Sequence, residues 1–266
     1  MDWRWAISTE YLYKYRSVSN EEFLRQIFVE HKLYFSRVSD FNDPFDCKFR
    51  SSFEATEREK ASYSKRLARQ YDGHLPRALR RQKESVYRKS LAGNVQSLAH
   101  ELERKWLDIR NNLGICSFSK VRDEILMWSH YADSHKGICI EFIDDPTDKF
   151  MARAQPVIYS KDYPVINRLK DSNDECLKKA LLTKSDRWSY EEEYRAIYNP
   201  EDQVTKGFGI KIFPECVMTG VIFGCNAEDA TIEKVKSFCV QGGLSLKFYQ
   251  ASIDRSSYSL NIAEIP

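Results

Sequence analysis

The 266-residue sequence lacks several features, and each absence excludes a class of protein. No apolar run approaches the roughly 20 residues that a membrane-spanning helix requires. The N-terminal stretch MDWRWAISTEYLYKYRS lacks the apolar core and small-residue cleavage site of a secretory signal. We therefore expect a cytoplasmic protein that has no membrane partner.

The seven cysteines form no CxxC pair and are odd in number. Several lie among apolar neighbours, as in GICSFS and GICIEF, where a free thiol behaves as a small buried hydrophobe. We therefore expect neither a structural zinc site nor a disulfide framework. Internal repeats and low-complexity linkers are also absent, so we expect no repeat architecture.

Positive and negative residues nearly balance, and the net charge is only +2. The charges are nevertheless distributed unevenly along the chain. Residues 58–89 carry eleven Lys or Arg against three acidic residues. The segment is either a solvated helical face or a patch that steers an anionic partner such as nucleic acid. In the second interpretation the contacting residues are Arg77, Arg80, Arg81 and Lys83.

Hydrophobic residues make up 42% of the chain, which is enough to bury a sizeable core. Period-two alternation predicts strands, at 11–16, 32–37, 113–119, 137–142, 155–159, 191–198, 207–213, 219–224 and 244–249. Helical patterns lie between the strands, at about 19–31, from 123, at 172–184 and at 228–241. We predict one α+β domain over 1–266, with a mixed, mainly antiparallel sheet core, flanking helices and a basic helical insertion at about 54–112.

The first of three motifs is FNDPFD, at residues 41–46. Asp43 precedes Pro44, which predicts a tight turn, and turn chemistry alone accounts for residues 42–44. The two phenylalanines either plug a sheet edge or wall a pocket floored by polar groups. The pocket interpretation takes the side chains of Phe41, Asn42, Asp43, Phe45 and Asp46.

The second motif, MWSHYAD, lies at residues 127–133 on the helix that starts near residue 123. His130 and His135 are about 140° apart around a helix, so they do not form the same-face pair that a metal needs. His130 is either a buried hydrogen-bonding residue or an acid, base or substrate-orienting group. Trp128 and Tyr131 are further candidate pocket residues.

The third motif is WSYEEEYR, at residues 188–195, and its Trp188 is another candidate pocket residue. Alternation along a strand would place Glu191, Glu193 and Arg195 on one face. Neighbouring carboxylates repel, which raises one pKa unless a cation or ligand compensates, so such a face is costly on a purely structural strand. The alternative is a surface ion-pair ladder, which would add little stability.

Together these motifs resemble a bacterial family known only as a domain of unknown function. Its marks are an early YKYR strand, FNDPFD, CSFS followed by MWSHYAD, then GICIEF and K(x)3W(x)2ExEYR, which here spans Lys184 to Arg195. The resemblance covers most of the chain except the basic insertion and the C-terminal tail. It implies no particular reaction. Members of such families often lie among anti-phage genes, which implies a context of phage defence.

A second resemblance is to ADP-ribosyltransferases of the arginine–serine–glutamate type. These enzymes place an arginine on an early strand, a serine on the next, and an ExE pair at the start of a late strand. Arg16, Ser36, Glu191 and Glu193 occur here in that order, although the serine lies in YFSRVS rather than in Ser-Thr-Ser. The resemblance implies NAD as cofactor, with Arg16 on its phosphate or ribose and Ser36 at the nicotinamide pocket. It also implies that Glu193 bonds the nicotinamide ribose and that Glu191 activates the acceptor.

Three functions stay open at this point. The first is NAD-dependent transfer to a protein or nucleic-acid acceptor, because a carboxylate can stabilise the oxocarbenium-like centre left when nicotinamide departs. In that enzyme His130 and Tyr131 would shape the pocket. The second is a non-catalytic sensor or nucleic-acid-binding module. The third is a magnesium-dependent nuclease, with Asp43, Asp46, Glu141, Glu191 and Glu193 as its carboxylates. No lysine is suitably placed beside those carboxylates, so we expect no metal site.

Overall fold

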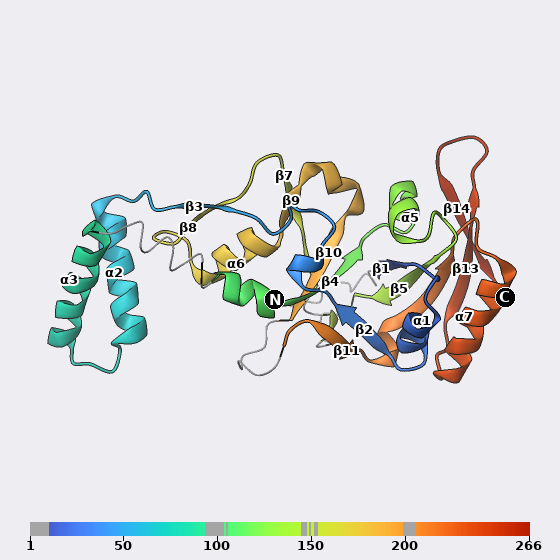
Figure 1. Cartoon of the computed structure of the whole chain (residues 1–266), viewed down its shortest axis with the longest axis horizontal. Coiled ribbons are helices and arrows are strands. Elements are labelled where there is room, and N and C mark those ends of the chain that lie inside the picture. Colours follow the sequence, from blue (N-terminus) through green and yellow to red (C-terminus); the bar gives the residue numbers. More distant parts are fainter. Residues whose placement is uncertain are drawn as a thin grey trace, which may run out of the picture. The chain divides into compact units, whose positions relative to one another are not determined.

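The computed structural model describes residues 11–93, 104, 106–144, 148, 150–151, 154–198 and 206–266. The chain divides into two compact units (Figure 1). Unit 1 comprises residues 1–41, 112–157 and 186–266, and unit 2 comprises residues 42–111 and 158–185. Most of the predicted helical insertion belongs to unit 2, and residues 94–103 and 105 of it lie outside the described residues.

Unit 1 is built on an eight-stranded sheet with the order β14-β13-β12-β5-β1-β4-β10-β6. Only the β12–β13 pair is parallel, and the other neighbours are antiparallel. The predicted α+β class with a mixed, mainly antiparallel sheet is therefore confirmed. The strands are β1 (Tyr11–Arg16), β4 (Gly114–Ser119), β5 (Ile138–Ile143), β6 (Ala154–Pro156), β10 (Glu193–Tyr198), β12 (Met218–Phe223), β13 (Lys247–Ile253) and β14 (Leu260–Ile265).

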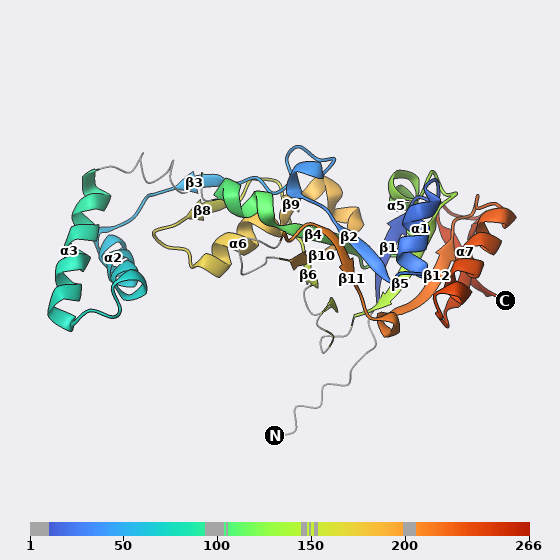
Figure 2. The ribbon, with the colours of Figure 1, turned by 60° about the horizontal axis from the view of Figure 1, so that its bottom comes forward.

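The two faces of this sheet carry different cores, because alternate residues of each strand point to opposite sides. Leu12 faces the larger core, where Phe28 and Phe142 are fully buried. Tyr13 and Tyr15 face a smaller core around Trp128. The helices that supply these cores are α1 (Glu21–Phe28) and α7 (Asp229–Gln241), which lie side by side in Figure 2, and α5 (Ile125–Tyr131).

A two-stranded ladder of β2 (Lys32–Phe35) and β11 (Gly209–Ile212) completes unit 1. Ser36 continues the path of β2 and forms an isolated bridge with Ile115 of β4. The bridge has two backbone hydrogen bonds of 2.9 Å. Ser36 is thus placed at the end of β4 that is remote from Ser119.

Unit 2 contains the predicted helical hairpin, formed by α2 (Glu57–Tyr71) and α3 (Arg77–Gly93). Residues 72–76 separate the two helices, and Thr56 and Glu59 form a capping box at the start of α2. Unit 2 also contains short strands and further helical residues: β3 (Arg50–Ser52) pairs with β8 (Val165–Asn167), β7 (Ile158–Ser160) pairs with β9 (Thr183–Ser185), α6 covers Asn173–Leu181, and residues 106–111 are helical.

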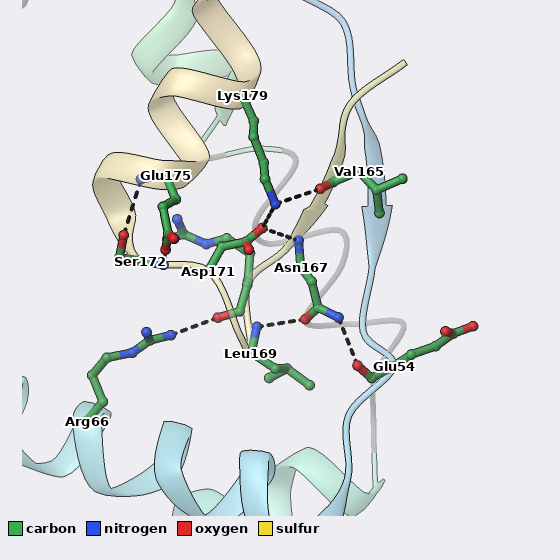
Figure 3. A network of polar contacts seen from close by, with 10 residues as sticks. Glu54, Arg66, Val165, Asn167, Leu169, Asp171, Ser172, Glu175 and Lys179 are labelled. Carbon is green, nitrogen blue, oxygen red and sulfur yellow. Dashed lines mark hydrogen bonds and ion pairs between the residues drawn. The ribbon is translucent and has the colours of Figure 1, made fainter. Parts of the chain in front are cut away.

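Polar contacts join β8 to the segments around it in unit 2 (Figure 3). The Nδ2 atom of Asn167 donates to the carbonyl of Glu54 at 2.8 Å, and its backbone N–H donates to Asp171 at 2.8 Å. Lys179 of α6 donates to the same Asp171 carboxylate at 2.7 Å and to the carbonyl of Val165. Because most of these bonds are partly buried, the network fixes the segment before α2 against β8 and α6.

Several predicted boundaries differ from the structure. The expected strand at 155–159 is split between β6 and β7, and the helix expected over 172–184 ends at Leu181, after which β9 begins. The N-cap of α1 is Asn20, whose side chain accepts from the backbone N–H of Phe23. The seven cysteines are free. None of the helices among the described residues is long and apolar enough to cross a bilayer.

Candidate functional site

The turn before β10 departs from the predicted strand. A 3-10 helix covers Asp186–Glu191, and the strand begins only at Glu193. The prediction that Glu191 and Glu193 lie on one face of a strand is therefore wrong. Glu192 between them has a φ of 40°, in the left-handed region that a residue with a side chain rarely adopts. Such strain is often stored at functional sites.

Glu191 is buried, at 3% exposed, and joins the second and third motifs. Its Oε1 atom accepts a hydrogen bond of 2.8 Å from the hydroxyl of Tyr131 at the end of α5. Its backbone carbonyl accepts a bond of 2.7 Å from the hydroxyl of Ser119, the last residue of β4. The two contacts hold the turn from two separate elements, so the carboxylate has a fixed position.

Glu193 and Arg195 form a buried ion pair. The guanidinium donates from Nε to Oε1 at 2.8 Å and from Nη2 to Oε2 at 2.9 Å. Arg195 is 0% and Glu193 is 4% exposed, so the alternative of a surface ladder is wrong for this pair. The ring of Phe41, from the first motif, lies 5.4 Å from the guanidinium carbon. The guanidinium of Arg195 thus orients the Glu193 carboxylate.

Two cations of β1 are also buried in unit 1. Lys14 donates to the carbonyl of Ser117 at 2.7 Å, and burial lowers its pKa to about 8, opposed in part by the nearby Glu193 carboxylate. Burial likewise lowers the pKa of Arg16. Among the described residues the Nε atom of Arg16 is buried and has no hydrogen-bond partner. A buried donor without a partner is costly, and an anionic ligand would supply the missing acceptor.

Ser36 lies away from Glu193. Ser36 bridges Ile115, and Ile115 pairs on its other side with Ile197 of β10. Ile197 is four residues beyond Glu193, which corresponds to roughly 13 Å along a strand. Arg16 lies at a position between Ser36 and Glu193, because its charge interacts with Cys116, and Cys116 pairs with Ala196. The structure therefore does not bring Ser36 beside the glutamates.

The remaining candidates of unit 1 differ in exposure. His130 is exposed, with its ring 6.2 Å from that of Tyr131. Trp128 is fully buried and packs edge-on against Tyr15 at 5.2 Å, so it belongs to the core rather than to an open pocket. Trp188 is half-buried, and its ring lies 6.1 Å from that of Tyr190.

The other residues of the first motif belong to unit 2. Asn42 and Phe45 are exposed, whereas Asp43 and Asp46 are buried. The Oδ1 atom of Asp43 accepts from the backbone N–H of Phe45 at 2.8 Å, as turn chemistry predicts. Its Oδ2 atom is buried without a partner among the described residues. Asp46 accepts from the backbone N–H of Cys47 at 2.7 Å.

The basic candidates Arg77, Arg81 and Lys83 are exposed on α3, and Arg80 is half-buried. One of the Arg80 nitrogens donates to the carbonyl of Gly73 at 3.3 Å, across the break between α2 and α3. In the part of the chain that the structure describes, no group of three His, Cys, Asp or Glu side chains is placed to hold a metal ion.

A row of polar side chains crosses the Tyr13 face of the sheet, and most of its members were not predicted as site residues. Strand pairing places side by side one residue from each of six strands: Glu193, Ser119, Tyr13, Glu141, Gly220 and Lys247. The alternation within each strand is visible in the sequence. The order of the strands is not, so the row could not be assembled from the sequence alone.

Comparison with known proteins adds one match. Neither the curated proteins nor the solved structures contain a match to this chain. Residues 127–196 match the model of a family described as a protein of unknown function (DUF2971). This stretch runs from Met127 to Ala196, so it holds both the Tyr131–Glu191 contact and the Glu193–Arg195 pair. This match supports the resemblance to a family of unknown function that the motifs indicated, over the segment that carries these contacts.

Proposed function

We propose that unit 1 is an ADP-ribosyltransferase-like enzyme that consumes NAD at the motif cluster, which we define as Phe41, Tyr131, Glu191, Glu193 and Arg195. The observation that carries the proposal is that these residues, from three separated motifs, meet at one strained turn. Glu193 is the first residue of a late strand and Glu191 lies in the turn before it. This is the order in which arginine–serine–glutamate transferases use their ExE pair.

The two glutamates would act in different steps of the reaction. The bond between C1′ of the ribose and the nicotinamide nitrogen breaks, and its electron pair leaves with nicotinamide. Glu193, oriented by Arg195, stabilises the positive ribose carbon. The acceptor atom then bonds to C1′ and gives its proton to Glu191, which Tyr131 orients. His130, exposed beside Tyr131, is an alternative group for this proton.

The diphosphate of NAD would be held by the cations of β1. Arg16 has a buried Nε without a partner among the described residues, and Lys14 lies close enough for its charge to interact with Glu193. Ser36 would contact a more distant part of the dinucleotide than the nicotinamide ribose. In this proposal the family context of phage defence gives the transfer its biological role.

We predict that Arg16→Met weakens NAD binding about 10- to 100-fold, because hydrogen bonds to charged groups contribute roughly 1.5–3 kcal/mol. Isothermal titration calorimetry of the full chain with NAD measures this affinity. Arg255→Met, at an exposed arginine between β13 and β14, is the matched control and should bind like the wild type. A wild-type chain that binds no NAD would end the proposal, and equal affinities for both variants would remove Arg16 from the phosphate site.

A second candidate function is nucleic-acid binding by α3, favoured by the exposure of Arg77, Arg81 and Lys83 on one helix. We expect Arg80→Glu/Arg81→Glu to weaken binding to duplex DNA at least tenfold. It should also reduce the slope of log affinity against log salt by about 2, since each phosphate contact contributes roughly 0.9. Fluorescence anisotropy between 50 and 200 mM salt, about the range over which such binding weakens, measures both quantities.

The control for this second function is the same double charge reversal on α7. Lys234→Glu/Lys236→Glu changes the net charge equally but lies in unit 1. If both double variants lose affinity to the same extent, only the net charge matters. If the α3 variant keeps full affinity, the basic helix is a solvated face.

A further inference from the structure

A groove of about 930 Å³ opens on the Tyr13 face of the sheet in unit 1. None of the sequence motifs accounts for it, and it does not include the residues of the motif cluster. Its size is within the range of pockets that hold small molecules. The side chains that matter below are Tyr13, Arg122, Glu141, Thr219, Lys247 and Tyr249.

The floor of the groove is a buried carboxylate. Glu141 of β5 is 5% exposed, and its Oε1 atom accepts a hydrogen bond of 2.8 Å from the hydroxyl of Thr219. Its Oε2 atom accepts a longer bond of 3.4 Å from the hydroxyl of Tyr13. The nearest cation is Arg122, whose Nη1 atom lies 3.9 Å from Oε2. A carboxylate has about four lone-pair positions, so each oxygen can still accept one donor from a ligand.

Gly220 lets the neighbouring strand come close to this carboxylate. It lies directly beside Glu141 on the neighbouring strand β12. A Cβ atom at this position would lie 3.3 Å from Oε1 of Glu141 and 3.2 Å from the ring of Tyr249, which is a tight contact with both. The missing side chain therefore lets the Glu141 carboxylate and the Tyr249 ring pack closely over β12, where both line the groove.

Tyrosines line the groove together with two cations, Arg122 and Lys247, and one exposed carboxylate, Glu215. Burial raises the pKa of Tyr13 to about 12, so its hydroxyl keeps its proton and stays a donor to Glu141 at neutral pH. The guanidinium of Arg122 lies 5.9 Å from the ring of Tyr249. Lys247 is exposed and lies next to Gly220 in the sheet. A ligand bound at Glu141 would therefore lie beside tyrosines, with Arg122 close to the carboxylate and Lys247 at the exposed side.

We propose that this groove binds a guanine nucleotide. Guanine presents two adjacent N–H donors, at N1 and the 2-amino group, which match the two acceptor positions left on Glu141. The planar base would stack on Tyr249, and the phosphate would lie toward Lys247. Adenine has no such pair of donors, and its N1 lone pair would face the carboxylate. The site is independent of the proposed transferase chemistry.

Calorimetric titration of the full chain with mononucleotides tests this specificity. We expect GMP to bind about tenfold more tightly than IMP, which lacks the 2-amino donor, because a hydrogen bond to a charged group is worth roughly a factor of ten or more. AMP should bind at least about a hundredfold more weakly than GMP, since a buried acceptor pair would be left unsatisfied. Equal affinities for GMP and AMP, or no binding of GMP, would overturn the proposal.

Two variants locate the binding at Glu141. Glu141→Gln offers only one acceptor to the base, and Gly220→Ala keeps the carboxylate but narrows the space beside it. Each should weaken GMP binding at least tenfold, whereas Glu233→Gln at an exposed position of α7 should not. Tighter binding of arginine methyl ester than of GMP would assign the groove to a guanidinium ligand and overturn the guanine assignment.

The test also separates this site from the motif cluster. Glu193→Gln should leave GMP affinity unchanged, because the strands β1 and β4 lie between Glu193 and Glu141. GMP binding without NAD turnover would support the groove and reject the transferase. NAD turnover without GMP binding would do the reverse.

Discussion

Replacing Arg195 by methionine is expected to lower the free energy of unfolding by about 3–5 kcal/mol. The substitution removes both bonds that the guanidinium makes to Glu193 and leaves that carboxylate at a site that is 4% exposed. Losing one partner of a buried pair is costly because the other charge keeps its desolvation penalty. Urea denaturation followed by circular dichroism measures the change.

Two further variants make the result interpretable. Glu193→Gln/Arg195→Met removes both charges, so it should recover a large part of the stability lost in the single variant. Lys234→Met breaks an exposed ion pair with Glu21 of the same length, 2.8 Å, and should cost less than about 1 kcal/mol. If Arg195→Met costs no more than Lys234→Met, the Glu193–Arg195 pair is solvated and its assigned role is wrong.

The second large effect concerns catalysis. Glu193→Gln should reduce kcat for nicotinamide release by about 10²–10³, the loss usual for removing one group that stabilises transition-state charge. Glutamine has nearly the same shape, so NAD affinity should stay within a few-fold of the wild type. Because the substitution also leaves Arg195 without its carboxylate, NAD affinity must be measured on the same sample. A variant that binds NAD and keeps its full kcat would show that Glu193 is not the catalytic carboxylate.

The strands of the sheet core could be predicted because each has one face or both faces buried. Alternation at Tyr11, Tyr13 and Tyr15 marks β1, and apolar runs mark β4, β5 and β12. The three-residue strands β3, β8 and β9 could not be predicted, since three residues are too few to establish a period. The strand β14, with its mostly exposed residues, gives only a weak hydrophobic pattern.

The candidate site could be predicted from the sequence only in part. The third motif could be singled out as a candidate site because neighbouring glutamates are costly on a plain strand. The geometry of this motif could not be predicted. Glutamate usually avoids a positive φ, so nothing in the sequence indicates that Glu192 adopts one. The contact between Tyr131 and Glu191 spans 60 positions of sequence and depends on how α5 packs against β1.

The groove around Glu141 could not be predicted from the sequence either. From the sequence Glu141 is one polar residue in the apolar strand GICIEF, and its relation to Tyr13 and Thr219 is not visible. The strand order β12-β5-β1 makes these three residues neighbours. Strand order depends on the packing of the whole sheet, so a single sequence without its fold does not identify such a site.

The proposed NAD-consuming site is tested most directly by the release of nicotinamide from NAD by the purified full chain, measured by chromatography with protein and nucleic-acid acceptors present. The wild-type chain should release nicotinamide about a hundredfold faster than Glu193→Gln. Release by the wild-type chain at the same rate as Glu193→Gln, or at the rate of NAD in buffer alone, would contradict the claim that the motif cluster is an NAD-consuming site.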